Sequence, residues 1–203
     1  MKHQNEIIKD SLSNAMSYIE YRALIKHLIT KEKSTGNEQS EALLHYSTLN
    51  DRRMNRWDKT LKLSAEAEEF FTSIQEPLTW LVISEGWCGD AAHVLPVLHT
   101  IAESSPAIDL KIVLRDKHPE LMDHFLTNGS RSIAKLIILD DQEQVLDTYG
   151  PRPSTATQMV SAQKREFGEL TPDFKEVLQL WYNKDKGQTI VNDLLKLHQD
   201  LNV

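Results

Sequence analysis

The spacing of apolar and polar residues changes along the chain. From about residue 5 to residue 32, apolar residues recur every three or four positions, which predicts one or two amphipathic helices. A polar stretch at 31–40 predicts a loop, and the helical spacing then returns and continues to about residue 74, with Ser64 placed to cap a helix. We therefore expect residues 1–76 to form an all-helical N-terminal extension.

Continuous apolar runs, which are typical of buried strands, begin near residue 80. The runs at 80–83 and 108–114 are separated by roughly thirty residues that hold one helix, so we expect two parallel strands joined by a right-handed crossover. A short helix is expected from Pro119 to Asn128-Gly129. Two further runs, at 135–139 and 144–149, are joined by a short turn and should pair antiparallel.

Helical spacing returns in the C-terminal part of the chain. It predicts helices at about 154–167, 172–184 and 187–201, the second of them capped by Thr171. This pattern divides the chain into the extension at 1–76, an α/β domain at 77–167 and C-terminal helices at 168–203 that pack on that domain. Because the apolar faces of the extension need covering, we expect it to pack on the domain or to mediate self-association.

The turn between the first strand and its helix holds the single cysteine of the chain, Cys88. Backbone N–H groups and the helix dipole at such a position favour a thiolate. Asp90 lies in the first helical turn and acts in the opposite direction, because a nearby negative charge disfavours the thiolate, and Glu85 adds to that effect. The sequence alone does not rank these influences on the thiol pKa.

The segment Glu85-Gly-Trp-Cys-Gly-Asp-Ala-Ala92, within a β–α–β–α–β–β–α order, resembles the active-site region of the thioredoxin superfamily. The resemblance covers about residues 77–167. Within that superfamily, the chain more closely resembles bacterial proteins of uncertain function that carry a monothiol Trp-Cys-Gly-Asp site. Three further segments carry this closer resemblance: Leu114-Arg-Asp116, Leu126-Thr-Asn-Gly129 and Arg131-Ser-Ile133. It implies a thioredoxin-like α/β fold, a central mixed sheet flanked by helices, with the N-terminal extension and the C-terminal helices added.

Three features that the family implies are absent from this chain. Ala91 stands where a second cysteine would resolve an intramolecular disulfide, and Val82 stands where a buried acid would assist the nucleophile. The loop of Ile133 and Ala134, which the resemblance implies to be the substrate loop, lacks the family's cis-proline. Because a cis bond before a residue other than proline costs about 2.5–4 kcal/mol, we expect the peptide before Ala134 to be trans unless the surrounding fold enforces the cis form.

Two functions stay open at this point. In one, Cys88 is a monothiol nucleophile, flanked by Trp87, Gly89, Asp90 and Ala91, that attacks a disulfide and is released by a second thiol. Its partners would be proteins or low-molecular-weight thiols. In the other, the chain is a catalytically inactive interaction module with the shape of a thioredoxin site. A cysteine-hydrolase arrangement does not fit the thioredoxin-like context.

Charged and aromatic residues near this segment also have two interpretations. Arg131 and Lys135 either brace a loop or attract an anionic thiol. Trp87 either packs against a partner or covers the helix end. The basic residues at 52, 53, 56, 59 and 62 form either a solvated face or a site for an anion or partner. Met122, Phe125 and Leu126 are predicted to be core residues.

Composition and charge narrow the function further. The net charge of −7 argues against a nucleic-acid partner, and no apolar run approaches the roughly 20 residues that cross a bilayer. The single cysteine and the lack of a signal-like N-terminus favour the cytoplasm. The eight histidines lack the spacing of a zinc site, so we expect no metal and no cofactor. A homo-oligomer would form through the N-terminal helices.

Overall fold

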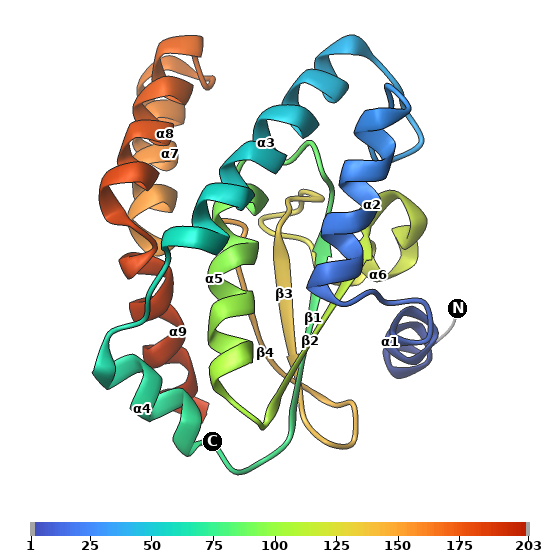
Figure 1. Cartoon of the computed structure of the whole chain (residues 1–203), viewed down its shortest axis with the longest axis vertical. Coiled ribbons are helices and arrows are strands. Elements are labelled where there is room, and N and C mark those ends of the chain that lie inside the picture. Colours follow the sequence, from blue (N-terminus) through green and yellow to red (C-terminus); the bar gives the residue numbers. More distant parts are fainter. Residues whose placement is uncertain (1–2, 202–203) are drawn as a thin grey trace.

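The computed structural model describes residues 3–201 and is built around a mixed sheet with strand order β2-β1-β3-β4 (Figure 1). The strands are β1 (Leu78–Ser84), β2 (Ile108–Leu114), β3 (Lys135–Leu139) and β4 (Val145–Tyr149). Strand β1 pairs parallel with β2 and antiparallel with β3, and β3 pairs antiparallel with β4. The predicted strand directions are confirmed. The apolar runs of β1 and β3 form strands because both of their faces are covered by helices.

The N-terminal helices pack on this sheet and share its hydrophobic core. Their bounds are α1 (Gln4–Leu12), α2 (Tyr18–Thr30), α3 (Glu41–Thr60) and α4 (Ala65–Ser73). Ile8, Tyr21, Ile25 and Met54 are buried in one continuous cluster with the strands. The cap of α4 is the predicted one, since the Ser64 hydroxyl accepts from the Ala67 N–H. The expected packing of the extension on the domain is confirmed.

Of the helices after β1, α5, α6 and α9 pack in two groups. Helix α5 (Ala91–Ser104) follows β1, and α9 (Gln188–Leu201) packs beside it, whereas α6 (Pro119–His124) packs against α1. Figure 1 shows the first group to the left of the sheet and the second to its right. The short helix η1 (Arg115–Lys117) connects β2 to α6. Helix α5 is apolar and buried through its first two turns, because the sheet lies below it and α3 crosses above it.

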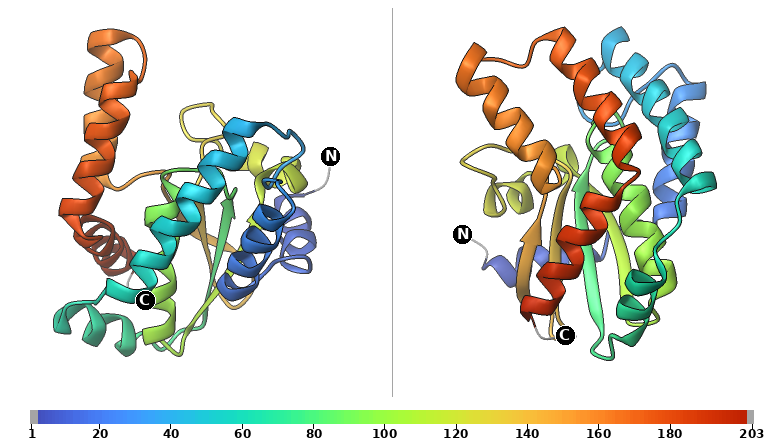
Figure 2. Two further views of the ribbon diagram at one scale, coloured as in Figure 1. Left: turned by 45° about the horizontal axis from the view of Figure 1, so that its top comes forward. Right: turned by 90° about the vertical axis from the view of Figure 1, so that its left-hand side faces the viewer.

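Helices α7 (Ser154–Phe167) and α8 (Pro172–Asp185) form a hairpin that projects from the rest of the molecule, as Figure 2 shows on its left. The hairpin has a small hydrophobic cluster of its own, made of Ala156, Val160, Leu178 and Tyr182. The predicted cap of α8 is confirmed, since the Thr171 hydroxyl accepts from the Phe174 N–H. Among the described residues, no helix combines the length and the apolar character that crossing a membrane requires.

Two predictions about the segment after α6 are wrong. The helix ends at His124, and Asn128-Gly129 instead forms a turn that Thr127 and Ser130 close with two backbone hydrogen bonds. Asn128 and Gly129 both have positive φ, which suits a turn. Because the helix stops before residue 126, Leu126 lies outside its buried face and is 39% exposed, whereas the other two predicted core residues, Met122 and Phe125, are buried.

Candidate functional site around Cys88

Cys88 lies between the end of β1 and the start of α5, and its thiol is almost completely covered. The S–H group donates to the carbonyl oxygen of Ile133, with 3.2 Å between Sγ and that oxygen. Burial raises the pKa of the Cys88 thiol to about 12, and the negative charge of Asp90 adds to the rise. Backbone N–H groups of Ala91 and Asp90 act in the opposite direction but are outweighed.

The peptide between Ile133 and Ala134 is cis, so the predicted trans peptide is wrong. That prediction rested on the intrinsic preference of a peptide bond, and the exception it allowed, in which the surrounding fold sets the cis form, is the one that applies here. Here Ala134 is buried between the thiol and the loop after β4. Gly150 approaches so closely that a Cβ on it would lie 2.3 Å from the Ala134 carbonyl oxygen, so only glycine fits there. The Gly150–Pro151 peptide is also cis.

Asp90 is the carboxylate nearest in sequence to the thiol, and it has two partners from distant parts of the chain. Arg152, in the loop after β4, pairs with it at 2.7 Å between Nη2 and Oδ2. The hydroxyl of Tyr182, on α8, donates to Oδ1 at 3.0 Å. Burial raises the pKa of Asp90 even though the Arg152 charge acts to lower it. The charge that disfavours the Cys88 thiolate is thus itself held by Arg152 and Tyr182.

His93 occupies the first turns of α5 as a buried, neutral ring. The indole N–H of Trp57 donates to Nδ1 at 2.9 Å, so Nε2 carries the hydrogen and donates to Oε1 of Gln179 at 2.8 Å. The ring stacks on Tyr182, with centroids 4.1 Å apart and planes 3° from parallel. Burial lowers the pKa of His93 to about 4. His93 therefore connects α5, which begins next to Cys88, to α3 and α8.

Sequence patterns do not indicate this network around Cys88 and His93. Arg152 belongs to a segment that reads as an irregular loop, and Tyr182, Trp57 and Gln179 occupy helix positions without a distinguishing pattern. The one local signal is Arg152 itself, a cation between two prolines directly after a strand. Nothing in the spacing of residues indicates that Tyr182 and Asp90, separated by 92 positions, hydrogen-bond to each other.

Glu85 and Trp87 border the site on the side of β2. Glu85 is fully buried, its Oε1 accepts the backbone N–H of Asp116 at 3.0 Å, and burial raises its pKa. Trp87 is half-buried, and the guanidinium of Arg115 lies 4.8 Å from its ring centroid. Trp87 is therefore the aromatic side chain of the motif that solvent reaches, while Gly89 beside it is only partly covered.

The two cations predicted to contact an anion lie in different surroundings. Arg131 is exposed and donates to both carboxylate oxygens of Asp123, at 2.6 and 2.5 Å. Lys135 is buried at the start of β3, with Nζ 3.5 Å from the Thr127 hydroxyl, and burial lowers its pKa. Within residues 3–201, no three His, Cys, Asp or Glu side chains gather in a way that would hold a metal ion.

Comparisons with known proteins support the fold. A protein of unknown function from Pseudomonas aeruginosa superposes with a TM-score of 0.60 at 17% identity, covering 91% of this chain and 98% of that one. An HIV epitope-scaffold superposes with a TM-score of 0.58 at 18% identity, covering 91% of this chain and 99% of that one. Identities this low show the fold alone. No curated protein matches the sequence.

A family model described as thioredoxin matches residues 36–166, which is more than half of the chain. The match begins within the loop before α3, so it includes two helices of the segment predicted to be an N-terminal extension. The division at residues 76 and 167 stays a prediction. The mixed sheet, the position of Cys88 between β1 and α5, and this match agree with one another: the chain belongs to the thioredoxin family.

Proposed function

We propose that this thioredoxin-family chain acts as a binding module in which Cys88 is kept as a protonated thiol, not as a constitutive disulfide oxidoreductase. The observation that carries the proposal is the position of Sγ, which is buried and donates to the Ile133 carbonyl oxygen. The thiolate, not the thiol, attacks disulfides. Because the thiol pKa is raised to about 12, almost no thiolate is present at neutral pH.

The surroundings of the thiol support the same proposal. Cys88 is the only cysteine, and the position where a resolving cysteine would stand is Ala91, so no intramolecular disulfide forms. Val82 is a fully buried apolar side chain where the family has an acid that moves the proton. We place the partner contact at Trp87 and Arg115, since Trp87 is the aromatic side chain of the motif that solvent reaches and the Arg115 guanidinium lies over its ring.

The test is the pH dependence of Cys88 alkylation by iodoacetamide, with the unfolded protein as the reference for an unprotected thiol. At pH 7 we expect the folded chain to react roughly a thousandfold more slowly than a cysteine of ordinary pKa, about 8.5. The rate should rise about tenfold per pH unit without levelling off below about pH 11, whereas the rate of the unfolded reference should level off above its ordinary pKa of about 8.5. Cys88→Ser, with unchanged circular dichroism, gives the background. An apparent pKa below 7, with a trapped mixed disulfide to a protein partner, would contradict the proposal.

Monothiol exchange is the second candidate, and one observation favours it. Cys88 faces the loop of Ile133 and Ala134 from the start of α5, which is where the resemblance to thioredoxins puts the nucleophile. In that reaction the Cys88 thiolate attacks one sulfur of a disulfide, forms a mixed disulfide and releases the other sulfur as a thiolate. A second thiol from solution then attacks the mixed disulfide and frees Cys88.

Incubation with glutathione disulfide distinguishes the two candidates. The binding-module proposal expects no glutathione adduct on Cys88 by mass spectrometry after the time in which a short cysteine peptide is fully modified. An adduct that forms at least as fast as on the peptide, and that reduced glutathione removes, would establish monothiol exchange and overturn the first proposal.

A further inference from the structure

Helix α3 separates its charges between two faces. Asp51 and Asp58 both pair with Arg22 of α2, so the acidic side of α3 is used within the N-terminal helices. Arg53 and Arg56 lie on the other side, one turn apart. Among the described residues neither pairs with a carboxylate, and the proximity of Arg56 contributes to lowering the pKa of Arg53, after burial. Uncompensated positive charge therefore accumulates on the side of α3 that faces α8.

Helix α8 offers matching polar residues to this side of α3. Gln179 and Asn183 are four residues apart and so share one face of the helix, and Lys186 directly follows its last residue. Arg56 donates to the Asn183 side-chain oxygen at 2.5 Å. One turn towards the N-terminus of α3, Arg53 lies near Gly89, and Gln179 of α8 lies near the same glycine. A Cβ on Gly89 would be 3.8 Å from Arg53 Nη1 and 4.0 Å from Gln179 Nε2. The two helices thus face each other with cations and amides.

A cavity of about 440 Å³ opens between the end of α3 and the junction of α8 and α9. Three cations line it, Arg56, Lys62 and Lys186, together with the polar side chains of Thr60, Asn183 and Gln188. Trp57 and Leu61 form its apolar wall. We call this the α3–α8 basic cavity.

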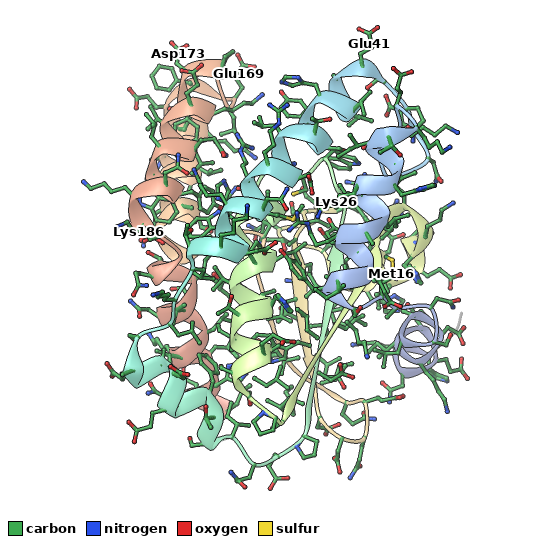
Figure 3. The ribbon with its side chains drawn as sticks, in the orientation of Figure 1. Met16, Lys26, Glu41, Glu169, Asp173 and Lys186 are labelled. Carbon is green, nitrogen blue, oxygen red and sulfur yellow. The ribbon has the colours of Figure 1, made fainter. Side chains whose placement is uncertain are left out.

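No carboxylate lines the α3–α8 basic cavity among residues 3–201. Asp185 is close in sequence, but both its oxygens accept from Thr189 in the first turn of α9. Figure 3 shows Lys186 at the base of the hairpin, whereas the acidic residues Glu169 and Asp173 lie at its far tip. Glu176 lies on the same face of α8 as Gln179, one turn closer to that tip, and it does not line the cavity.

Lys186 lies in the turn between α8 and α9. Lys186 has φ 54° and ψ 31°, a left-handed conformation that glycine or asparagine adopts more readily than lysine. Gly187 follows with φ 79°, and a Cβ on it would lie 2.9 Å from the Val97 side chain, so the turn is packed tightly against α5. Lys186 therefore lines the cavity from a tightly packed turn.

We propose that the α3–α8 basic cavity binds the phosphate group of a small molecule. Three cations without a facing carboxylate match a dianion better than a single carboxylate, and a guanidinium such as Arg56 donates in pairs to phosphate oxygens. The cavity volume falls within the range of small-molecule sites, about 300–1,000 Å³. The proposal does not depend on the chemistry of Cys88, so it goes beyond the binding-module function.

The test is isothermal titration of the full chain with inorganic phosphate and with glycerol 3-phosphate, at constant ionic strength set by chloride. Acetate serves as the monoanion. The cavity variant is Arg56→Gln with Lys186→Gly, in which glycine preserves the left-handed turn and removes the charge. The matched control is Arg52→Gln with Lys59→Gln, which removes two exposed charges from the same helix outside the cavity. Thermal unfolding checks that both variants fold.

We expect phosphate or its monoester to bind with a dissociation constant below about 1 mM, and the cavity variant to weaken binding at least about tenfold. The control should stay within about twofold of wild type. Tighter binding of glycerol 3-phosphate would identify an organic phosphate as the ligand class, and tighter binding of phosphate would identify the free anion. Absence of saturation by about 10 mM, equal weakening in both double variants, or acetate binding as tightly as phosphate would overturn the proposal.

Discussion

Arg22 and Arg152 both hold carboxylates in covered positions, but their surroundings differ. Arg22 joins α2 to α3 through Asp51 and Asp58, whose side chains keep 16% and 34% of their exposure. Arg152 binds Asp90, whose side chain keeps 11% and which lies two residues from Cys88. Water therefore shares in solvating the first pair of acids, whereas Asp90 depends on Arg152 and Tyr182.

This difference separates a structural ion cluster from one that acts on a reactive group. Around Arg22 the charges only join two helices. Around Arg152, burial raises the pKa of Asp90 while the Arg152 charge acts to lower it, and the negative charge of Asp90 in turn raises the pKa of Cys88. A change at Arg152 should thus alter both stability and thiol chemistry, while a change at Arg22 should alter stability alone.

The largest effect is expected from Arg152→Met. It leaves Asp90 buried without a cation and should lower the free energy of unfolding at pH 7 by about 3 kcal/mol, since breaking a buried pair leaves an uncompensated charge. Arg22→Met should lower the free energy of unfolding by about half as much, because water can solvate the carboxylates of Asp51 and Asp58 once the arginine is gone. Urea unfolding of both variants measures the difference. An equal or larger loss in Arg22→Met would contradict the comparison.

The second prediction concerns His93 and acid. Its folded pKa is about 4, below the ordinary value of about 6.5, so the stability it contributes is present above pH 6.5 and is lost as the pH falls towards 4. The full loss is about 3 kcal/mol. His93→Phe keeps a flat ring against Tyr182 but cannot titrate. The variant should be less stable at pH 7 and should lose less stability than wild type between pH 7 and pH 4.

Unfolding curves at several pH values test this prediction. The raised pKa of Asp90 acts in the opposite sense, giving stability at low pH that is lost as the pH rises through it, and it is present in both proteins. The other histidines of lowered pKa, His99, His118 and His198, are likewise present in both. The difference between the stability-versus-pH curves of wild type and His93→Phe therefore reports the titration of His93. Parallel curves would show that His93 is not the group that titrates.

Asp90→Asn tests the influence of the carboxylate on the thiol. Removing the charge should lower the apparent pKa of Cys88 by roughly one unit, because a like charge has been removed. The thiol pKa should stay above its ordinary value, because burial is the larger cause of its rise. The pH dependence of alkylation measures both. Asp58→Asn, in the Arg22 cluster, is the matched control and should leave the alkylation profile unchanged.

The smallest effect is expected from Arg131→Gln. Arg131 and Asp123 are both exposed, and an exposed ion pair adds little to stability even with two good hydrogen bonds. We expect no measurable shift of the urea midpoint and no change in alkylation of Cys88 by negatively charged iodoacetate. A slower reaction with iodoacetate, but not with neutral iodoacetamide, would instead support the interpretation that Arg131 attracts anionic thiols.

The sequence predicted the elements of this fold better than the contacts between them. Apolar periodicity placed β1, β2 and α5 correctly, because the residues that form each element are neighbours in the chain. The cis peptide before Ala134 was not predicted, because it is set by the surrounding fold. The partners of Asp90 cannot be predicted for a related reason, since Arg152 and Tyr182 lie far from it in the chain and meet it only in the folded structure.

The hairpin of α7 and α8 has its own small core, and one member of that core, Tyr182, also donates to Asp90. We expect a segment built this way to open as a cooperative local unit, at a lower free energy than global unfolding. Such an opening would remove the Tyr182 and Gln179 hydrogen bonds from Asp90 and His93, both of which lie close to Cys88 in the chain. Hydrogen exchange of α8 amides and chemical labelling of Cys88 should therefore share one opening equilibrium, which makes thiol accessibility a property gated by helix undocking.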